Sequence, residues 1–454
     1  MTLAPNSAEA RDIAYHFHSY TNAMVHADQG PQIMENAEGV YVFDNQGKRY
    51  IEAMAGLWSV AVGFGEKRLI NAATAQMEKM AYYHNFAHRT HPAVIDLAEK
   101  LVSMAPVPMS KAFFTNSGSE ANDTVMKMLW YRSNAMGMPQ KKKFISRIRG
   151  YHGVTIASAS LTGLPYNHTS FDLPIDGVLH TTCPHYWKEG QEGETEEEFA
   201  TRCAEDLDRM IQEEGPDTIA AFFAEPVMGA GGVVVPPATY WEKVQAVLAK
   251  YDIIFVADEV INGFGRTGNM FGSQTYDLTP DVIVLSKQIT SSYVPFSAIL
   301  VNDRFYEPIA EESGRIGVLG HGFTGAGHPV GAAVALENIA IIEERGLVEK
   351  AAETGAYFRH QLAKFDGHPF VGETRGVGLI AALQLDHPEF EVKPGLMGAA
   401  MGKELYARGV ISRPMIDAMA FCPPLIIEQD QVDVIIDTVA AGLEAVLQLA
   451  FEPV

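Results

Sequence analysis

The sequence contains few residues of the kinds that mark disulfide-rich, membrane-spanning or nucleic-acid-binding proteins. Its three cysteines, Cys183, Cys203 and Cys422, are far apart and form no CxxC pair, so no disulfide framework is expected. No apolar run approaches the roughly 18 residues that a membrane helix needs. Lys and Arg number 34 against 56 Asp and Glu, a formal charge of −22, which argues against nucleic acid or an anionic membrane as a partner.

Targeting and metal signals are also missing. The first twelve residues include Glu9, Arg11 and Asp12 and have no apolar core of signal-peptide length. His84 and His88 have a spacing that suits two ligands on one helix face, but no cysteine or acidic residue follows at metal-ligand spacing. We therefore expect a cytoplasmic protein with no metal site.

What the chain does have is length and a regular alternation of apolar runs with helical stretches. Its 454 residues, 47% of them hydrophobic, are enough for a large core and a second lobe. Residues 39–51 alternate about an Asn-Gln-Gly turn and predict a β-hairpin. Further along, residues 330–344 predict a long helix and residues 376–383 predict one strand.

From residue 111 onward, each apolar run ends in polar or glycine-rich residues. In parallel sheets the carboxyl ends of the strands gather at one edge, where ligands bind. This pattern predicts an α/β fold with a doubly wound, mostly parallel sheet. The groups expected at its ligand edge are Ser117, Tyr151, Glu225, Asp258 and Lys287.

Two charges at the ends of buried strands need a physical reason, because burying an unpaired charge is costly. One explanation is an ion pair between Asp258 and Lys287 that ties the sheet together. The other is a lysine that forms a Schiff base with a carbonyl cofactor, with the acid tuning what it binds. Burial favours the neutral amine, which is the nucleophile this chemistry requires.

A helix N-terminus is expected at the same edge. Ser117 and Glu120 have the spacing of a capping box at the start of a helical stretch. A helix N-terminus offers free N–H groups to an anion, and glycine at position 118 lets the backbone approach a phosphate closely. A helix cap without a ligand is the alternative interpretation.

The segment 258–268, DEVINGFGRTG, followed by Ser286-Lys287, resembles the signature of class III (omega) aminotransferases among the fold type I pyridoxal-phosphate enzymes. The similarity extends from about Glu38 to the C-terminus and is greatest to the amine:pyruvate branch. The resemblance implies a large sheet domain over residues 61–330. It also implies a small α+β domain that combines residues 1–60 with residues 331–454.

The resemblance implies pyridoxal 5'-phosphate as the cofactor, with Lys287 and Asp258 as catalytic residues. His152 is expected to hold Asp258, and the loop around Thr324 is expected to reach the neighbouring subunit of a homodimer or tetramer with shared sites. The positions implied to bind the cofactor are Ser117, Gly118, Ser119, Tyr151, His152, Glu225, Asp258, Val260, Lys287, Gly322, Phe323 and Thr324.

The resemblance also implies a substrate pocket. Arg413 matches a mobile arginine that binds a keto acid's carboxylate, and a fixed surface arginine is the alternative. Ile261 stands where 2-oxoglutarate enzymes carry a glutamine, which favours pyruvate. Trp58 and Phe86 could instead be ordinary core residues. The implied substrate-binding positions are Tyr20, Leu57, Trp58, Phe86, Tyr151, Ala230, Ile261 and Arg413.

The expected activity is transfer of an amino group from a primary amine or omega-amino acid to pyruvate, giving alanine, with ping-pong kinetics. One alternative is β-alanine or taurine as the amino donor. A second alternative is another pyridoxal-phosphate reaction on the same fold, such as decarboxylation or amino-group migration. A third alternative is a non-catalytic member of the family, but the retained Lys287 and Asp258 argue against it.

Overall fold

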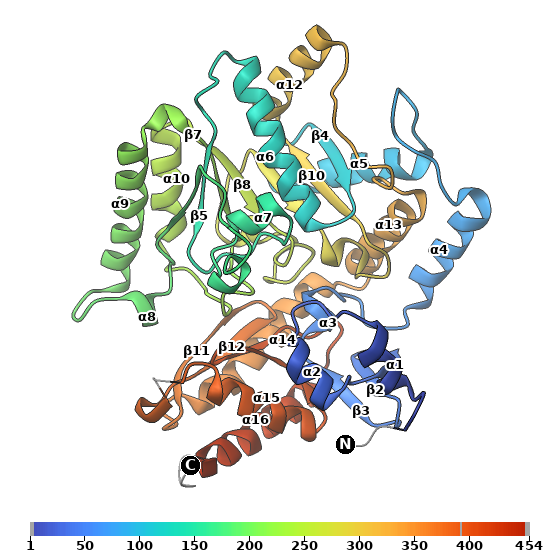
Figure 1. Cartoon of the computed structure of the whole chain (residues 1–454), viewed down its shortest axis with the longest axis vertical. Coiled ribbons are helices and arrows are strands. Elements are labelled where there is room, and N and C mark those ends of the chain that lie inside the picture. The colour runs from blue at the N-terminus through green and yellow to red at the C-terminus, as the bar shows by residue number, and fades with distance from the viewer. Residues whose placement is uncertain (1–3, 391–392, 450–454) are drawn as a thin grey trace.

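The computed structural model describes residues 4–390 and 393–449 and is built around a seven-stranded sheet (Figure 1). The strand order is β4-β10-β9-β8-β7-β5-β6, and only β10 runs antiparallel to its neighbours. The predicted mostly parallel sheet is therefore confirmed. Its strands are β4 (Lys111–Thr115), β5 (Lys143–Arg147), β6 (Val178–Thr181), β7 (Ile219–Ala224), β8 (Ile254–Asp258), β9 (Val282–Leu285) and β10 (Ser297–Val301).

Helices cover both faces of this sheet, which explains why its central strands β7, β8 and β9 are almost entirely apolar. On one face, α6 (Gly118–Ala135) and α12 (Asp303–Ile316) pack against the sheet. The other face is covered by α9 (Glu196–Glu214) and α10 (Tyr240–Lys250), and by a group of three further helices. That group consists of α4 (Lys67–Met80), α5 (Pro92–Met104) and α13 (Pro329–Glu344).

The two ends of the chain meet in a smaller α+β part. A four-stranded sheet has the order β1-β2-β3-β13, and its β13 pairs in parallel with β3, so residues near 410 extend the N-terminal hairpin. Its strands are β1 (Met34–Glu38), β2 (Tyr41–Asp44), β3 (Arg49–Glu52) and β13 (Val410–Ile411). The predicted hairpin is confirmed. The domain boundaries at residues 60 and 330 stay a prediction.

A second four-stranded sheet, β11-β12-β15-β14, packs with three helices in this smaller part (Figure 1). Its strands are β11 (Val371–Val377), β12 (Ile380–Leu385), β15 (Ala418–Phe421) and β14 (Arg413–Met415), and the helices are α14 (Leu347–Leu362), α15 (Leu396–Ala407) and α16 (Gln429–Leu449). The remaining helices are α1 (Ala8–Tyr15), α2 (Ala23–Gln29), α3 (Ala55–Trp58), α7 (Ile156–Leu161), α8 (Tyr186–Glu189) and α11 (Gly272–Thr275). In the described residues, no helix is both long and apolar enough to cross a membrane.

The predicted single strand over residues 376–383 is wrong, because the chain reverses within it. Gly378 has a φ of 52°, a left-handed conformation that glycine adopts without steric cost, and it separates β11 from β12. At the same turn, the buried Arg266 donates to the carbonyl oxygen of Leu379 at 2.8 Å, and it also donates to that of Pro423, after β15, at 2.7 Å. These bonds attach the glycine-rich segment after β8 to the smaller part of the chain.

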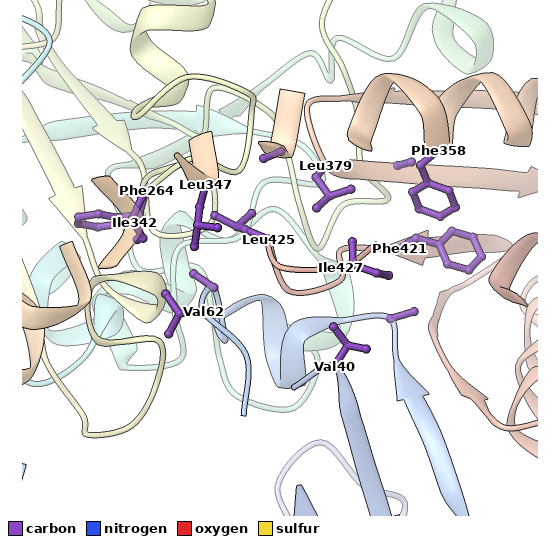
Figure 2. Close-up of a cluster of buried hydrophobic side chains, with 14 of the residues drawn as sticks. Val40, Val62, Phe264, Ile342, Leu347, Phe358, Leu379, Phe421, Leu425 and Ile427 are labelled. Carbon is purple, nitrogen blue, oxygen red and sulfur yellow. The ribbon is translucent and has the colours of Figure 1, made fainter. Parts of the chain in front are cut away.

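Apolar side chains complete this attachment. Figure 2 shows Phe264, from the segment after β8, in one buried cluster with Leu347, Leu379 and Leu425. The cluster is continuous with the packing of α4, α5 and α13 on the large sheet. The two parts of the chain therefore share a core, and the position of one constrains the other.

Tight packing between α14 and the β11–β12 turn gives a stability prediction. A Cβ at Gly355 would lie 1.9 Å from the Gly378 carbonyl oxygen. We expect Gly355→Ala to lower the free energy of unfolding by about 1–3 kcal/mol through overpacking. Thermal unfolding followed by circular dichroism should show a melting temperature several degrees lower.

Gly314 provides the matched control, because it lies in α12 and a Cβ there meets no atom within 4 Å. Gly314→Ala should be neutral or should stabilise the chain by about 0.5–1 kcal/mol, as expected for Gly→Ala in a helix. Equal melting temperatures for the two variants would contradict the packing argument.

Candidate active site

Lys287 stands at the ligand edge of the sheet in an unusual backbone conformation. It opens a short 3-10 helix (Lys287–Thr290) directly after β9 with a φ of 46°, which is uncommon for a residue with a side chain. Burial lowers the pKa of its amine to about 8, although the charges of Asp258 and Glu225 act in the opposite direction. A useful fraction of the amine is therefore neutral and nucleophilic near neutral pH.

Asp258 ends β8 and is held by two side-chain donors. Its Oδ2 accepts hydrogen bonds from His152 Nδ1 at 2.8 Å and Asn122 Nδ2 at 2.9 Å, and only 2% of the residue is exposed. The expected contact of His152 is thus present. In the described residues the salt-bridge partner of Asp258 is His152 rather than Lys287. An Asp258–Lys287 ion pair therefore does not explain the two charges.

The sequence did not single out Asn122, which connects these elements. Its Nδ2 donates both to Asp258 and to the His152 carbonyl oxygen at 2.7 Å, and the residue is buried. Asn122 lies one helical turn after Gly118, on the same face of α6. The sequence could have pointed to Asn122, because a polar residue four positions after Gly118 lies on the same helix face as the expected anion site.

The N-terminus of α6 faces Val260 and keeps free donors. Ser117 Oγ accepts from Glu120 N at 3.2 Å, but the Glu120 carboxylate turns to Asn116, so only half of the predicted capping box forms. Among the described residues no acceptor takes the backbone N–H groups of Gly118 and Ser119. These donors can bind an anion.

The space beside these donors is narrow. A Cβ at Gly118 would lie 3.1 Å from Val260 Cγ2, and one at Gly153 would lie 2.6 Å from Ser119 Oγ. Ser119 Oγ also accepts from Val154 N at 3.1 Å. The loop after β5 therefore packs directly on the start of α6.

Glu225, at the end of β7, fixes two loops at once. Its carboxylate accepts from Tyr151 N at 3.0 Å and from Gly229 N at 2.9 Å. The residue is buried, and burial raises the pKa of this carboxyl. Glu225 thus places Tyr151 on one side of the site and the loop carrying Ala230 on the other.

Arg413 approaches the same region from β14. The half-buried side chain lies close enough to Lys287, Tyr151 and Tyr166 for its charge to affect the pKa of each. No acceptor among the described residues takes a hydrogen bond from its guanidinium group. Arg413 therefore has no fixed partner among the described residues, and its binding of a keto acid stays a prediction.

Tyr20 comes from the N-terminal segment and joins the group. Burial, and then a hydrogen bond with Tyr20, raise the pKa of Tyr151. The Tyr20 hydroxyl accepts from Asn167 Nδ2 at 2.7 Å, and its ring meets Tyr166 edge-on at 6.4 Å. Tyr166 and Asn167 were missed in the sequence, because nothing in the local pattern distinguishes them from other loop residues.

An apolar wall borders the group. Trp58 and Ile261 are 1% and 4% exposed and share one cluster with Met415 and Cys422. A Cβ at Gly229 would lie 2.4 Å from Ile261 Cδ1, so the loop that carries the half-buried Ala230 packs on this wall. Leu57, by contrast, is exposed.

The remaining expected positions form a separate group at the surface, in which Phe323 is half-buried. Phe86 lies against Gly322, whose Cβ would be 2.8 Å from the ring, and Tyr82 Oη donates to the Thr324 carbonyl oxygen at 2.8 Å. Phe323 belongs to the same loop. In the described part of the chain, no hydrogen bond joins this group to Lys287, Asp258 or Arg413.

Comparison with known proteins agrees with this geometry. The family model for class-III aminotransferases matches residues 23–443. An omega transaminase from Pseudomonas jessenii, in complex with PMP, is 57% identical with a TM-score of 0.96, covering 98% of this chain and 99% of that one.

Two further relatives extend the comparison. A structure described as a transaminase with L-ala is 63% identical with a TM-score of 0.91, covering 92% of this chain and 100% of that one. The mitochondrial gamma aminobutyrate transaminase 1 of Solanum lycopersicum is 48% identical over 427 residues, which are 92% of this chain and 82% of the relative. The chain therefore belongs to the class III aminotransferases, transaminases of fold type I that use pyridoxal phosphate.

Proposed function

We propose that this transaminase moves an amino group from a primary amine or omega-amino acid to pyruvate and so forms alanine. The observation that carries the proposal is the pairing of one uncommitted cation, Arg413, with the apolar wall of Trp58 and Ile261. A pyruvate carboxylate needs the cation, and an apolar amine needs the wall. The relative described with L-ala, the amino acid that pyruvate would yield, supports this choice of acceptor.

The residues at the ligand edge fit the cofactor. Lys287 offers an amine for the aldehyde of the cofactor, and Asp258 offers a carboxylate for its ring nitrogen. The free N–H groups of Gly118 and Ser119 are donors for its phosphate. A Cβ at position 118 would crowd Val260 and narrow that phosphate site. We assign Tyr151, His152 and Glu225 to the same site, because they hold or adjoin these groups.

The protein's own groups do the positioning and proton transfer. Pyridoxal phosphate, when bound, supplies a carbonyl for the substrate amine and a ring that withdraws electrons. Lys287 would hold the cofactor through its amine and, when that amine is free, would take a proton from the substrate carbon and deliver it to the cofactor carbon. Asp258, fixed by His152 and Asn122, would keep the ring nitrogen protonated. Asn122 and His152 act only through Asp258 and are positioning residues.

Arg413 allows one pocket to bind two unlike substrates in turn. Two parallel N–H groups of a guanidinium can bind a carboxylate, which gives both strength and orientation. An apolar amine has no acid group, so the side chain must then turn toward solvent. Its lack of a fixed partner in the described residues is consistent with such a movement.

A second candidate is transfer from an omega-amino acid such as γ-aminobutyrate, β-alanine or taurine. The 48% identity to a γ-aminobutyrate transaminase supports this second candidate. In that reaction Arg413 would bind the acid group of the donor as well as that of the acceptor. Decarboxylation and amino-group migration can be distinguished from transamination to pyruvate, because neither reaction forms alanine.

A substrate panel tests the proposal. Each donor, an apolar primary amine, β-alanine, taurine or γ-aminobutyrate, is offered with pyruvate or 2-oxoglutarate, and the amino acid product is measured. Alanine formed faster than glutamate supports the proposal. Glutamate as the main product, or carbon dioxide release without alanine, would overturn it.

Arg413→Ala in the same assay separates the two half-reactions. Loss of charged hydrogen bonds worth about 1.5–3 kcal/mol should raise the KM for pyruvate roughly ten- to a hundredfold. The kcat/KM for the apolar amine should change by less than about threefold, because the amine does not need the cation. Arg408→Ala, at the end of α15 beside Glu404, is the control and should change neither constant.

The lowered pKa of Lys287 predicts how cofactor capture depends on pH. The neutral amine reacts with the aldehyde, and burial brings its pKa from 10.5 down to about 8. Capture of added pyridoxal phosphate by the apoenzyme, followed by absorbance, should therefore speed up as the pH rises through about 8 and then level off. A rate that still rises above pH 10 would show an ordinary lysine.

We also propose that Phe86, Gly322 and Thr324, which are exposed, and the half-buried Phe323 complete the site of a second subunit in a homodimer. These residues support one another through Tyr82 and Asn85 but do not bond to their own Lys287 site. A two-fold dimer would place each such group at the partner's site.

Subunit mixing tests this arrangement. Lys287→Ala and Thr324→Ala chains, each impaired alone, should regain activity in about a quarter of all sites after full exchange, because each mixed dimer has one intact site. A mixture of Lys287→Ala with Arg413→Ala is the control and should regain nothing, because both residues belong to one subunit's site. No recovery in the first mixture, with exchange shown by mass spectrometry, would place Thr324 in its own subunit's site.

A further inference from the structure

Three histidines surround one aspartate near the N-terminus, outside the active site. Asp12 lies in α1, His16 and His18 lie just after it, and His26 lies in α2. The proposed transamination assigns no role to these side chains. In Figure 1, α1 and α2 are the dark-blue helices beside the smaller part of the chain.

All three imidazoles point a nitrogen at the same carboxylate. His18 Nε2 and His26 Nε2 lie 2.7 and 3.0 Å from Asp12 Oδ2, and His16 Nδ1 lies 3.1 Å from Oδ1. Neighbouring ring centroids are 4.1 and 4.2 Å apart. Although partial burial opposes ionisation, hydrogen bonds from the three histidines lower the pKa of Asp12, so the carboxylate is an anion.

We propose that Asp12, His16, His18 and His26 form a binding site for a divalent transition-metal ion of the zinc class. The ligand atoms of Asp12, His16 and His18 all lie within 4.8 Å of one another. A tetrahedral site with metal–ligand distances of about 2.0–2.1 Å needs ligand atoms roughly 3.4 Å apart, so small movements of these three side chains suffice. His26 lies outside that group, with Nε2 3.0 Å from Asp12 Oδ2, and would turn toward the ion as the fourth ligand.

The chemistry of the donors narrows the choice of metal. Three imidazole nitrogens and one carboxylate suit Zn²⁺, Co²⁺ or Ni²⁺, whereas Mg²⁺ and Ca²⁺ prefer oxygen ligands. Each histidine must present an unprotonated nitrogen to the metal, so the N–H now directed at Asp12 moves to the other ring nitrogen by exchange with solvent.

The sequence alone led us to expect no metal site, and this proposal differs from that expectation. The ligands follow the pattern Asp-x3-His-x-His-x7-His, which matches no common metal motif and lacks cysteine. The turn between α1 and α2 brings His26 back to the other three. A sequence pattern cannot show that turn.

The site would also stabilise a segment that reaches the active site. Tyr20 lies between His18 and His26, has a φ of 50°, and accepts from Asn167 beside the pocket. A metal that joins α1 to α2 restrains both ends of this segment. Terminal segments need such restraint, because few contacts hold them.

Calorimetric titration of chelator-treated holoenzyme with Zn²⁺ tests the proposal. Wild type should bind one ion per chain, and His18→Ala, His26→Ala and the isosteric Asp12→Asn should each weaken binding at least about tenfold. His360→Ala, which removes an exposed histidine of α14, is the control and should bind like wild type. Zn²⁺ should also slow tryptic cleavage after Arg11 in wild type but not in the double variant His18→Ala/His26→Ala.

Cobalt provides a second measurement that does not depend on how well a variant folds. Co²⁺ added to wild type should give visible d–d bands that Zn²⁺ abolishes by competition. The absence of saturable Zn²⁺ binding, or equal affinity in wild type and the double variant, would overturn the proposal and leave the histidines as hydrogen-bond donors to Asp12. Transaminase activity is not a readout here, so failure would leave the proposed function intact.

Discussion

The structure depends on the cost of keeping the Asp258 carboxylate out of water at the end of a buried strand. An ionised carboxylate there is tolerated only with hydrogen-bond donors. The two side-chain donors come from separate elements, His152 from the loop after β5 and Asn122 from α6. The hydrogen bonds to this one carboxylate therefore fix the end of β8, the loop after β5 and α6 relative to each other. The same arrangement leaves the α6 N-terminus and Lys287 at one edge.

The substrate selection that we propose for Arg413 depends on a different part of the chain. Arg413 belongs to β14 in the smaller part of the chain, whereas Lys287 follows β9 of the large sheet. The distance between them is set by the buried Arg266 and by the apolar cluster around Phe264 and Leu425. Tight packing here gives a geometric precision that flexible surface contacts would not.

The sequence predicted the ligand edge of the site well because the relevant information is local. Strand ends are visible as the end of an apolar run, and parallel strands bring those ends together whatever their order. Asp258, Glu225 and Lys287 were found in this way. The break at Gly378 was not, since an apolar run does not show a reversal that depends on one left-handed glycine packed on a neighbouring turn.

The missed features all depend on contacts between residues far apart in the chain. Asn122 is an ordinary polar residue until α6 is placed beside β8, and the histidines become a cluster only when α2 folds back on α1. The same limit applies to Tyr166 and Asn167, which meet Tyr20 only when the N-terminal segment folds onto the loop that carries them. If Tyr20 lines the substrate pocket, as we propose, the pocket keeps its shape only while this segment is held in place. Restraint of the α1–α2 turn would then serve the active site as well as the N-terminus.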